Sequence, residues 1–314
     1  SLPAQMKNSN NKALSALTAC WASALLMLLG ACASYAQQAL PAANLWLLPS
    51  PPLGGRVAER PVLLSGFNPG GYNNQPAFFG PDRLFLTVQT AADTTQTDIV
   101  ELRLNTREWV QVTATPRLSE YSPTPHPDGL RFSAVRVEAD NRQRLWIFPI
   151  DRSDSGMPVL PDQDRIGYHA WLDGQSLALF IVGDDPQSHR LAYADLRGGA
   201  LRRIAGNPGR CLRRLPDGRL AYVQKATEQT WFLKTWNPNT SQHDILIAMP
   251  QGSEDFDILP DRSFVCARGS MLFRFKAGQD SDWKLYADLT PYGIRNISRI
   301  AVGPGGAMAF VAAP

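Results

Sequence analysis

Residues 127–135 read Pro-Asp-Gly-Leu-Arg-Phe-Ser-Ala-Val, a tight turn followed at once by an apolar, strand-like run. Proline presets φ, aspartate hydrogen-bonds its own backbone and glycine accepts a positive φ, so the triplet suits a hairpin. The turn, or a degraded form of it, occurs six times, with central residues separated by 46, 45, 44, 44 and 44 positions. The six copies are Pro81-Asp82-Arg83, Pro127-Asp128-Gly129, Leu172-Asp173-Gly174, Pro216-Asp217-Gly218, Pro260-Asp261-Arg262 and Pro304-Gly305-Gly306.

The segments between the turns read as short strands. Each turn is followed by an apolar run such as Leu220–Val223, and each complete repeat then carries a second run such as Leu145–Phe148. Four strands in about 45 residues form one propeller blade. The sequence therefore predicts an all-β, six-bladed β-propeller with four-stranded antiparallel blades. No segment has a sustained helical period, which argues against a parallel α/β fold.

The two ends of the repeat region complement each other. After Gly306 the chain has room for one more strand, so the last blade lacks its two outer strands. Asn44–Leu48 resembles a second strand of a blade, and Arg60–Leu64 resembles an outermost strand. We expect residues 44–314 to form one domain, its ring closed by N-terminal strands that complete the last blade and remove a free sheet edge.

The block from Glu120-Tyr121-Ser122-Pro123 to Pro127-Asp128-Gly129 resembles the WD-like, Ser-Pro-Asp-Gly turn repeats of TolB-type propellers. The resemblance covers residues 44–314 and implies the same six-bladed fold. Propellers of this type include translocation-system proteins, propeller domains of peptidases, and lyases, so the resemblance implies a fold and leaves the activity open. Arg83 and Arg262 replace the turn glycine in two copies.

Residues 1–36 have the pattern of a targeting segment. Met6–Lys12 is basic and polar, and Ala13–Ala36 follows without a charge, as in a secretory signal that starts at Met6. Cleavage after Ala36 would begin the mature chain at Gln37, with residues 37–43 as a linker. A bacterial lipobox ending at Cys32 would instead place a lipid anchor there, and an uncleaved membrane anchor is the third alternative.

The composition gives little indication of chemistry. There are 31 Lys and Arg against 28 Asp and Glu, or 29 against 28 without Lys7 and Lys12, so no basic surface for nucleic acid is expected. The histidines lack ligand spacing, and His126, His189 and His243 are expected on the solvated surface, so no metal or cofactor is predicted. Gly-x-Ser-x-Gly and a glycine-rich phosphate loop are both missing from the sequence. The other two cysteines, Cys211 and Cys266, lie in apolar runs, as free buried thiols do, although an oxidising compartment permits a disulfide.

The innermost strand of each blade precedes its turn, so polar residues at the start of that strand are candidates for the mouth of the central channel. These candidates are Asn74, Glu120, Tyr121, His169, Arg210, Glu254, Asp255 and Arg299. Such a set could hold a polar ligand that carries both charges. The alternative is that the side chains pair with one another and fill the channel. Glu120 with Glu254 or Asp255 could also form a glycosidase-like pair, although no catalytic residue is assigned.

From these features we expect an exported, monomeric binding scaffold in a bacterial envelope, periplasmic or associated with the outer membrane. It would hold a protein or peptide partner or a ligand, and would touch a membrane only through a lipid on Cys32. The alternative is a glycan- or small-molecule-active hydrolase or lyase with its site at the channel mouth.

Overall fold

The computed structural model describes residues 39–314. The predicted signal segment, with Met6 and the lipidation candidate Cys32, lies outside the described residues. Just before the first strand, the Leu40 amide donates to Gln89 Oε1 (2.8 Å) and the Ala43 amide to the Gly71 carbonyl (3.1 Å).

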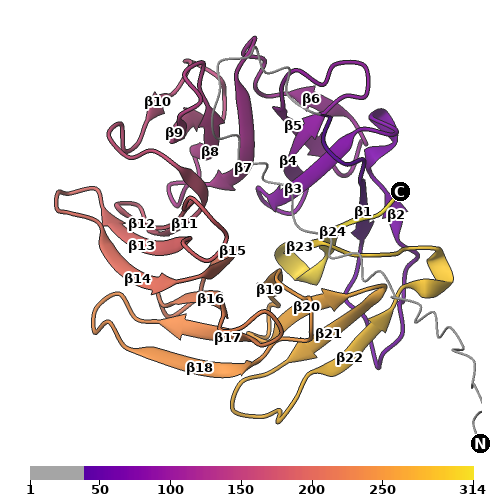
Figure 1. Ribbon diagram of the computed structural model, residues 1–314. Helices are drawn as coiled ribbons and strands as arrows, with labels where there is room; N and C mark the ends of the chain where they lie inside the picture. Colours follow the sequence, from indigo (N-terminus) through magenta and orange to yellow (C-terminus); the bar gives the residue numbers. More distant parts are fainter. Residues whose placement is uncertain (1–38) are drawn as a thin grey trace, which may run out of the picture. The chain divides into compact units, whose positions relative to one another are not determined.

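Twenty-four strands of residues 39–314 form six four-stranded antiparallel sheets, which stand in a ring (Figure 1). We number the sheets as blades 1 to 6 in the order of their inner strands. Blade 1 consists of β3 (Tyr72–Phe78), β4 (Arg83–Gln89), β5 (Asp98–Arg103) and β6 (Trp109–Gln111). Blade 2 consists of β7 (Ser119–Pro125), β8 (Arg131–Val137), β9 (Gln143–Pro149) and β10 (Met157–Pro158). Blade 3 consists of β11 (Ile166–Asp173), β12 (Ser176–Ile181), β13 (Arg190–Asp195) and β14 (Arg202–Gly206).

The other half of the ring has the same construction. Blade 4 consists of β15 (Pro208–Arg214), β16 (Leu220–Lys225), β17 (Trp231–Trp236) and β18 (His243–Ala248). Blade 5 consists of β19 (Phe256–Ile258), β20 (Phe264–Arg268), β21 (Met271–Phe275) and β22 (Lys284–Asp288). Blade 6 consists of β23 (Arg299–Val302), β24 (Met308–Ala312), β1 (Asn44–Leu48) and β2 (Val62–Leu63). Three 3-10 turns accompany the strands: η1 (Ser65–Phe67), η2 (Thr290–Tyr292) and η3 (Pro304–Gly306). The predicted fold is confirmed.

Blade 6 closes the ring as the sequence predicted. Strand β1 pairs antiparallel with β24, in register from Asn44 opposite Ala312 to Leu48 opposite Met308. The short strand β2 then covers the other edge of β1. Because the two ends of the domain share one sheet, their hydrogen bonds join the first blade to the last.

Each predicted turn joins the inner strand of its blade to the second strand. Gly129 and Gly218 adopt the positive φ that these turns require, 71° and 86°. Arg262 adopts a φ of 67° at the same place in blade 5. In blade 5 the turn geometry is thus kept although the glycine has been lost, at a steric cost. In blade 1, Arg83 does not adopt a positive φ and is instead the first residue of β4.

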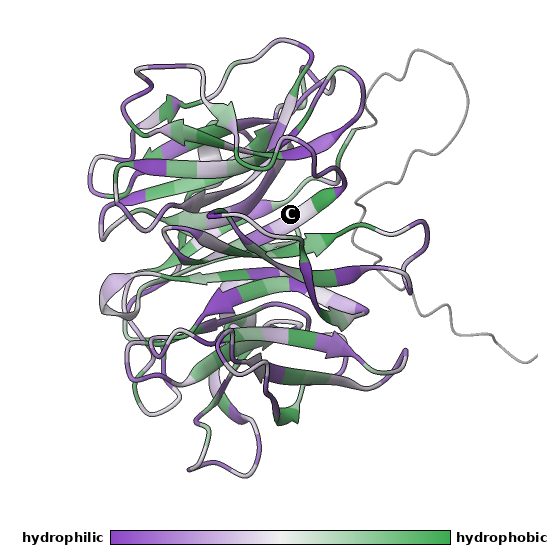
Figure 2. Cartoon of the chain, turned by 90° about the vertical axis from the view of Figure 1, so that its left-hand side faces the viewer, coloured by the Kyte–Doolittle hydropathy of each residue, from purple (hydrophilic) through white to green (hydrophobic). Residues whose placement is uncertain are grey.

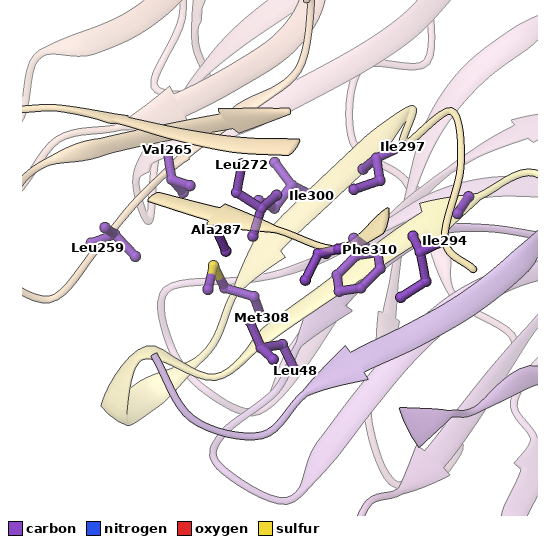
Figure 3. Packing of buried hydrophobic residues seen from close by; sticks show 12 residues of the cluster. Leu48, Leu259, Val265, Leu272, Ala287, Ile294, Ile297, Ile300, Met308 and Phe310 are labelled. Atoms are coloured by element: carbon purple, nitrogen blue, oxygen red, sulfur yellow. The ribbon is translucent and has the colours of Figure 1, made fainter. Parts of the chain in front are cut away.

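The core lies between neighbouring blades. Leu48 of β1 and Phe310 of β24 pack with Val265 and Leu272 of blade 5, and all four are fully buried (Figure 3). Each such side chain contributes about 1.5–3 kcal/mol by leaving water. Hydrophobic residues follow the strands, and many connecting loops are hydrophilic (Figure 2). No helix within residues 39–314 has the length and apolarity needed to cross a membrane.

Candidate functional site

The inner strands bring a group of ionisable side chains together at the centre of the ring. We call these the channel cluster; its members are Tyr168 on β11, Arg210 on β15, Lys225 at the end of β16, Glu254 and Asp255 just before β19, and Arg299 at the start of β23. They lie at the beginning of the inner strands, or at the end of the antiparallel second strand. Both positions belong to the same end of the ring, which we call the mouth.

The strongest contact of the channel cluster joins Arg210 to Asp255. Arg210 Nε donates to Asp255 Oδ1 at 2.9 Å, and its Nη2 donates to the Ser298 carbonyl of blade 6 at 2.7 Å. Burial would raise the pKa of the Asp255 carboxyl, but Arg210 and Arg299 hold it below its usual range. Burial likewise opposes the charge of Arg210, yet Asp255 and Glu254 raise its pKa. The pair is therefore charged in the folded state.

Glu254 is held by the neighbouring blade. Its Oε1 accepts from the Arg210 backbone amide at 2.8 Å and lies 3.0 Å from Lys225 Nζ. Its Oε2 is 3.9 Å from Arg210 Nη1. Lys225 thus neutralises Glu254 on one side while Arg210 approaches it on the other.

Arg299 spans the channel. Its Nη2 donates to the Tyr168 hydroxyl at 3.1 Å, and the guanidinium lies 5.3 Å from the centre of the Tyr168 ring. Blades 6 and 3, which carry these two residues, stand on opposite sides of the ring (Figure 1). The nearest carboxylate contact of Arg299 is Asp255 Oδ2, at 3.6 Å. Tyr72 on β3 is close enough for Arg299 to affect its pKa, which burial raises.

A second ion pair lies further along the same strands. Arg213 on β15 contacts Asp257 on β19 at 3.0 Å and donates to the Ile300 carbonyl of β23 at 3.3 Å. Asp257 Oδ2 also accepts from the Val302 amide at 2.8 Å. Blades 4, 5 and 6 are thereby connected to one another at two levels.

Glu120 lies away from the channel cluster, on the face of β7 that packs between blades. Its Oε1 accepts from Arg136 Nε at 2.8 Å, and its backbone carbonyl accepts from Thr97 of blade 1. Arg136 in turn lies over the rings of Trp146 and Phe148. Burial raises the pKa of Glu120, and its Oε2 is buried without a hydrogen-bond partner in the described residues. None of its described contacts involves Glu254 or Asp255, so the structure does not assemble the glycosidase-like pair.

His169 also belongs to an inter-blade contact. Its Nε2 lies 2.6 Å from Ser133 Oγ of blade 2, which also accepts from Trp171 Nε1 at 2.9 Å. Burial lowers the pKa of His169 to about 3, so the imidazole is neutral at pH 7. Together with the Glu120–Arg136 pair, these residues form what we call the inter-blade network.

The two other candidates make more local contacts. Asn74 is half-buried on β3, and its Oδ1 accepts from the Gln75 amide at 2.8 Å. Tyr121 is half-buried on β7 and lies close enough to Tyr72 to affect its pKa.

Sequence reasoning missed Lys225, Arg213, Asp257 and Tyr72. Asp257 is two residues after Asp255 and so on the same face of a strand, which is a signal that the sequence did offer.

No family model and no curated protein matches the chain. Among solved structures, a TolB-type protein from Agrobacterium tumefaciens aligns with a TM-score of 0.60 at 12% identity, over 86% of this chain and 97% of that one. TolB from Acinetobacter baumannii aligns with a TM-score of 0.53 at 13% identity, over 86% of this chain. The fold is that of a TolB-like six-bladed β-propeller. An oligogalacturonate lyase in complex with manganese aligns with a TM-score of 0.53 at 14% identity, over 81% of this chain and 80% of that one.

The chain spans 64% of the length of the Acinetobacter TolB. Identities of this size show the shared fold, and activity has to be argued from the site. Within residues 39–314 of this TolB-like ring, no three His, Cys, Asp or Glu side chains are grouped so as to hold a metal ion. Cys211 and Cys266 are free and buried, and burial raises the pKa of the Cys211 thiol to about 12.

One surface assignment was wrong. His126 is buried beside Asp128, with Nδ1 3.0 Å from Oδ2, and its ring meets the edge of Trp171 at 4.4 Å. The TolB-like turn places this histidine against the next blade, where packing removes it from water. His243 is exposed and His189 half-buried.

Proposed function

We propose that the protein is an exported, non-catalytic binding propeller that holds a protein or peptide partner at the mouth of its ring. The observation that carries this proposal is the pairing in the channel cluster. Arg210 with Asp255 and Lys225 with Glu254 form close ion pairs, so these carboxylates are neutralised and not poised as acids or bases. Such groups suit the recognition of a polar surface better than proton transfer.

Export is the second part of the proposal, and the sequence supports it. Met6–Lys12 followed by the uncharged Ala13–Ala36 is the pattern of a secretory signal. The mass of the mature protein tests this part. A chain beginning at Gln37 fits a cleaved signal, and a lipid on Cys32 fits an envelope lipoprotein. An unprocessed chain recovered from the cytoplasm would contradict export.

Site-specific photo-crosslinking tests the binding face. In an antiparallel blade, the loop between the second and third strands lies at the mouth, and the turn after the inner strand lies at the opposite end. Exposed Glu228, in the loop after β16, reports on the mouth, and exposed Leu130, in the turn before β8, reports on the far end. A photoreactive residue at position 228 is expected to capture a defined partner in cells, and the same residue at position 130 is the matched control.

Capture at position 130 alone, or the same products from both positions, would contradict binding at the mouth. Turnover of an oligosaccharide or lactone by the purified chain, abolished by Asp255→Asn, would instead establish the hydrolase or lyase alternative.

A further inference from the structure

The charges around the channel do not balance. Four cationic side chains, Arg210, Arg213, Lys225 and Arg299, face three carboxylates, Glu254, Asp255 and Asp257. Each carboxylate has a cation at about hydrogen-bond distance: Lys225 on Glu254 at 3.0 Å, Arg210 on Asp255 at 2.9 Å and Arg213 on Asp257 at 3.0 Å. One positive charge in this group is therefore left over.

The surplus charge belongs to Arg299. Its only carboxylate contact in the described residues is with Asp255, at 3.6 Å, and Asp255 is already engaged by Arg210. The side chain is 14% exposed, so water compensates the charge only in part. Within residues 39–314 its side chain donates a hydrogen bond to the neutral hydroxyl of Tyr168. A largely buried cation without its own counter-ion is costly, and proteins usually pair it.

The surroundings of Arg299 indicate which anion would fit. The guanidinium is a planar fork that binds a carboxylate through two parallel hydrogen bonds. The Tyr168 hydroxyl accepts from Arg299, and its own hydrogen can be donated to an anion beside the guanidinium. A single surplus charge matches a monoanion better than the dianion of a phosphate monoester. Because the paired side chains occupy the mouth, a terminal group of a chain suits it better than a whole bulky ligand.

We propose that Arg299, with Tyr168, forms a carboxylate-binding subsite at the mouth of the ring. The subsite rests on the proposed binding function and deepens it, because it specifies the group of the partner that enters. The carboxylate can be the free C-terminus of a peptide, an acidic side chain within one, or a small organic acid. All three present the same two oxygens to Arg299.

Calorimetric titration of the full chain at low salt tests the subsite with matched probes. The probes are acetyl-Gly-Gly-Ala as the free acid, the same peptide as its amide, acetyl-Gly-Asp-Gly-amide, and acetate. The free acid is expected to bind at least about 10-fold more tightly than the amide, since a charge-assisted hydrogen bond is lost in the amide. Tighter binding of the aspartyl peptide or of acetate would identify the other two sources of the carboxylate.

Two variants and a control test whether carboxylate binding depends on Arg299 and Tyr168. Arg299→Met is expected to weaken carboxylate binding about 10- to 100-fold, and Tyr168→Phe by a smaller factor. Arg197→Met is the control, because Arg197 is exposed and pairs with Asp195 away from the mouth. Thermal unfolding separates a binding role from a structural one. Arg299→Met removes the surplus charge but also the contacts of Arg299 with Asp255 and Tyr168, so its melting temperature without ligand should fall much less than that of Asp255→Asn.

The subsite is overturned if acid and amide peptides bind equally, or if no carboxylate probe saturates the wild type below about 100 mM. It is also overturned if Arg299→Met binds like the wild type, or if this variant melts as low as Asp255→Asn. These results leave the binding function itself untouched, since capture at position 228 reports a partner at the mouth whatever group that partner presents. Conversely, if position 228 captured no partner while the purified chain still bound carboxylates, the proposal of a protein or peptide partner would be contradicted and the subsite would stand.

Discussion

Two buried arginine–carboxylate pairs of the ring, Arg210–Asp255 and Arg136–Glu120, differ in their neighbours. Arg210–Asp255 belongs to the channel cluster, where a second arginine approaches the same carboxylate at 3.6 Å. Arg136–Glu120 belongs to the inter-blade network, where aromatic rings cover the guanidinium and no further cation is within ion-pair distance of Glu120 in the described residues. The pKa of Asp255 is accordingly lowered and that of Glu120 raised.

This difference distinguishes Arg136–Glu120, a structural pair, from Arg210–Asp255, which lies beside an additional positive charge. In the inter-blade network one cation meets one carboxylate, and the pair mainly fixes how two blades pack. In the channel cluster the excess of cations stabilises every carboxylate and leaves Arg299 available. Buried ion pairs with similar contact distances can therefore serve different ends, and the local charge count distinguishes them.

Of the substitutions considered, Asp255→Asn is expected to lower the free energy of unfolding most. The substitution keeps the shape of the side chain but leaves Arg210 and Arg299 without their shared carboxylate. Removing one partner of a buried pair should lower the free energy of unfolding by about 3–5 kcal/mol. Urea unfolding at pH 7 measures this. A loss below about 1 kcal/mol would mean that the channel charges are solvated and not coupled.

The pH dependence of stability tests the inter-blade network through His169. The folded-state pKa is about 3, below the ordinary value of 6.5, so the unfolded chain binds a proton first as the pH falls. The stability due to neutral His169 is full above pH 6.5 and decreases toward pH 3. Between pH 7 and pH 5 the loss should be about 2 kcal/mol.

The matched variant for this measurement is His169→Gln, whose side chain can still bond Ser133 but does not titrate. Between pH 7 and pH 5 the free energy of unfolding should fall for both proteins, but the fall should be about 2 kcal/mol smaller for His169→Gln than for the wild type. The other three histidines are present in both proteins, so their contributions cancel in the comparison. Parallel curves for the two proteins would contradict a buried, neutral His169.

Glu120→Gln should cost less than Asp255→Asn, about 1–2 kcal/mol. The amide oxygen can still accept from Arg136, and the rings of Trp146 and Phe148 continue to cover that guanidinium. Urea unfolding of both variants under the same conditions compares the two losses in free energy of unfolding directly. If Glu120→Gln proved the more destabilising of the two, the distinction between the two regions would be lost.

The smallest effect should come from a turn that belongs to neither region. Arg262 adopts a φ of 67° in the blade 5 turn. Arg262→Gly relieves that strain and should raise the free energy of unfolding by up to about 1 kcal/mol, with carboxylate binding unchanged. A calorimetric melting temperature below that of the wild type would show that the Arg262 side chain has a stabilising role of its own.

Much of the fold could be predicted from the sequence, because the turn triplet recurs at a nearly constant interval and each inner strand must precede it. The same rule named Arg210, Asp255 and Arg299, whose side chains the structure brings into contact. It could not decide between the two faces of a strand. Glu120 and Tyr121 are adjacent, so one points between blades and the other lies near Tyr72, and a shift of one residue exchanges them.

Bulges and distant strands account for the residues that were missed. The pairing of β15 with β16 shifts register between Pro208 and Leu212, so Arg213 comes three residues after Arg210 in place of the even spacing of a regular strand. Lys225 ends a second strand, where no pattern on the inner strand points to it. Neither position could be assigned without the paired strands in three dimensions.

The most direct test compares the two arginines within one molecule. The Nε–H resonances of Arg299 and Arg136 in the full chain can be followed by NMR during titration with acetyl-Gly-Gly-Ala as its free acid, and again as its amide. We predict that the acid shifts the Arg299 resonance saturably and leaves that of Arg136 in place, whereas the amide shifts neither. An unmoved Arg299 resonance, or equal shifts of both arginines, would contradict the claim that the mouth of the ring carries a free charge for recognition.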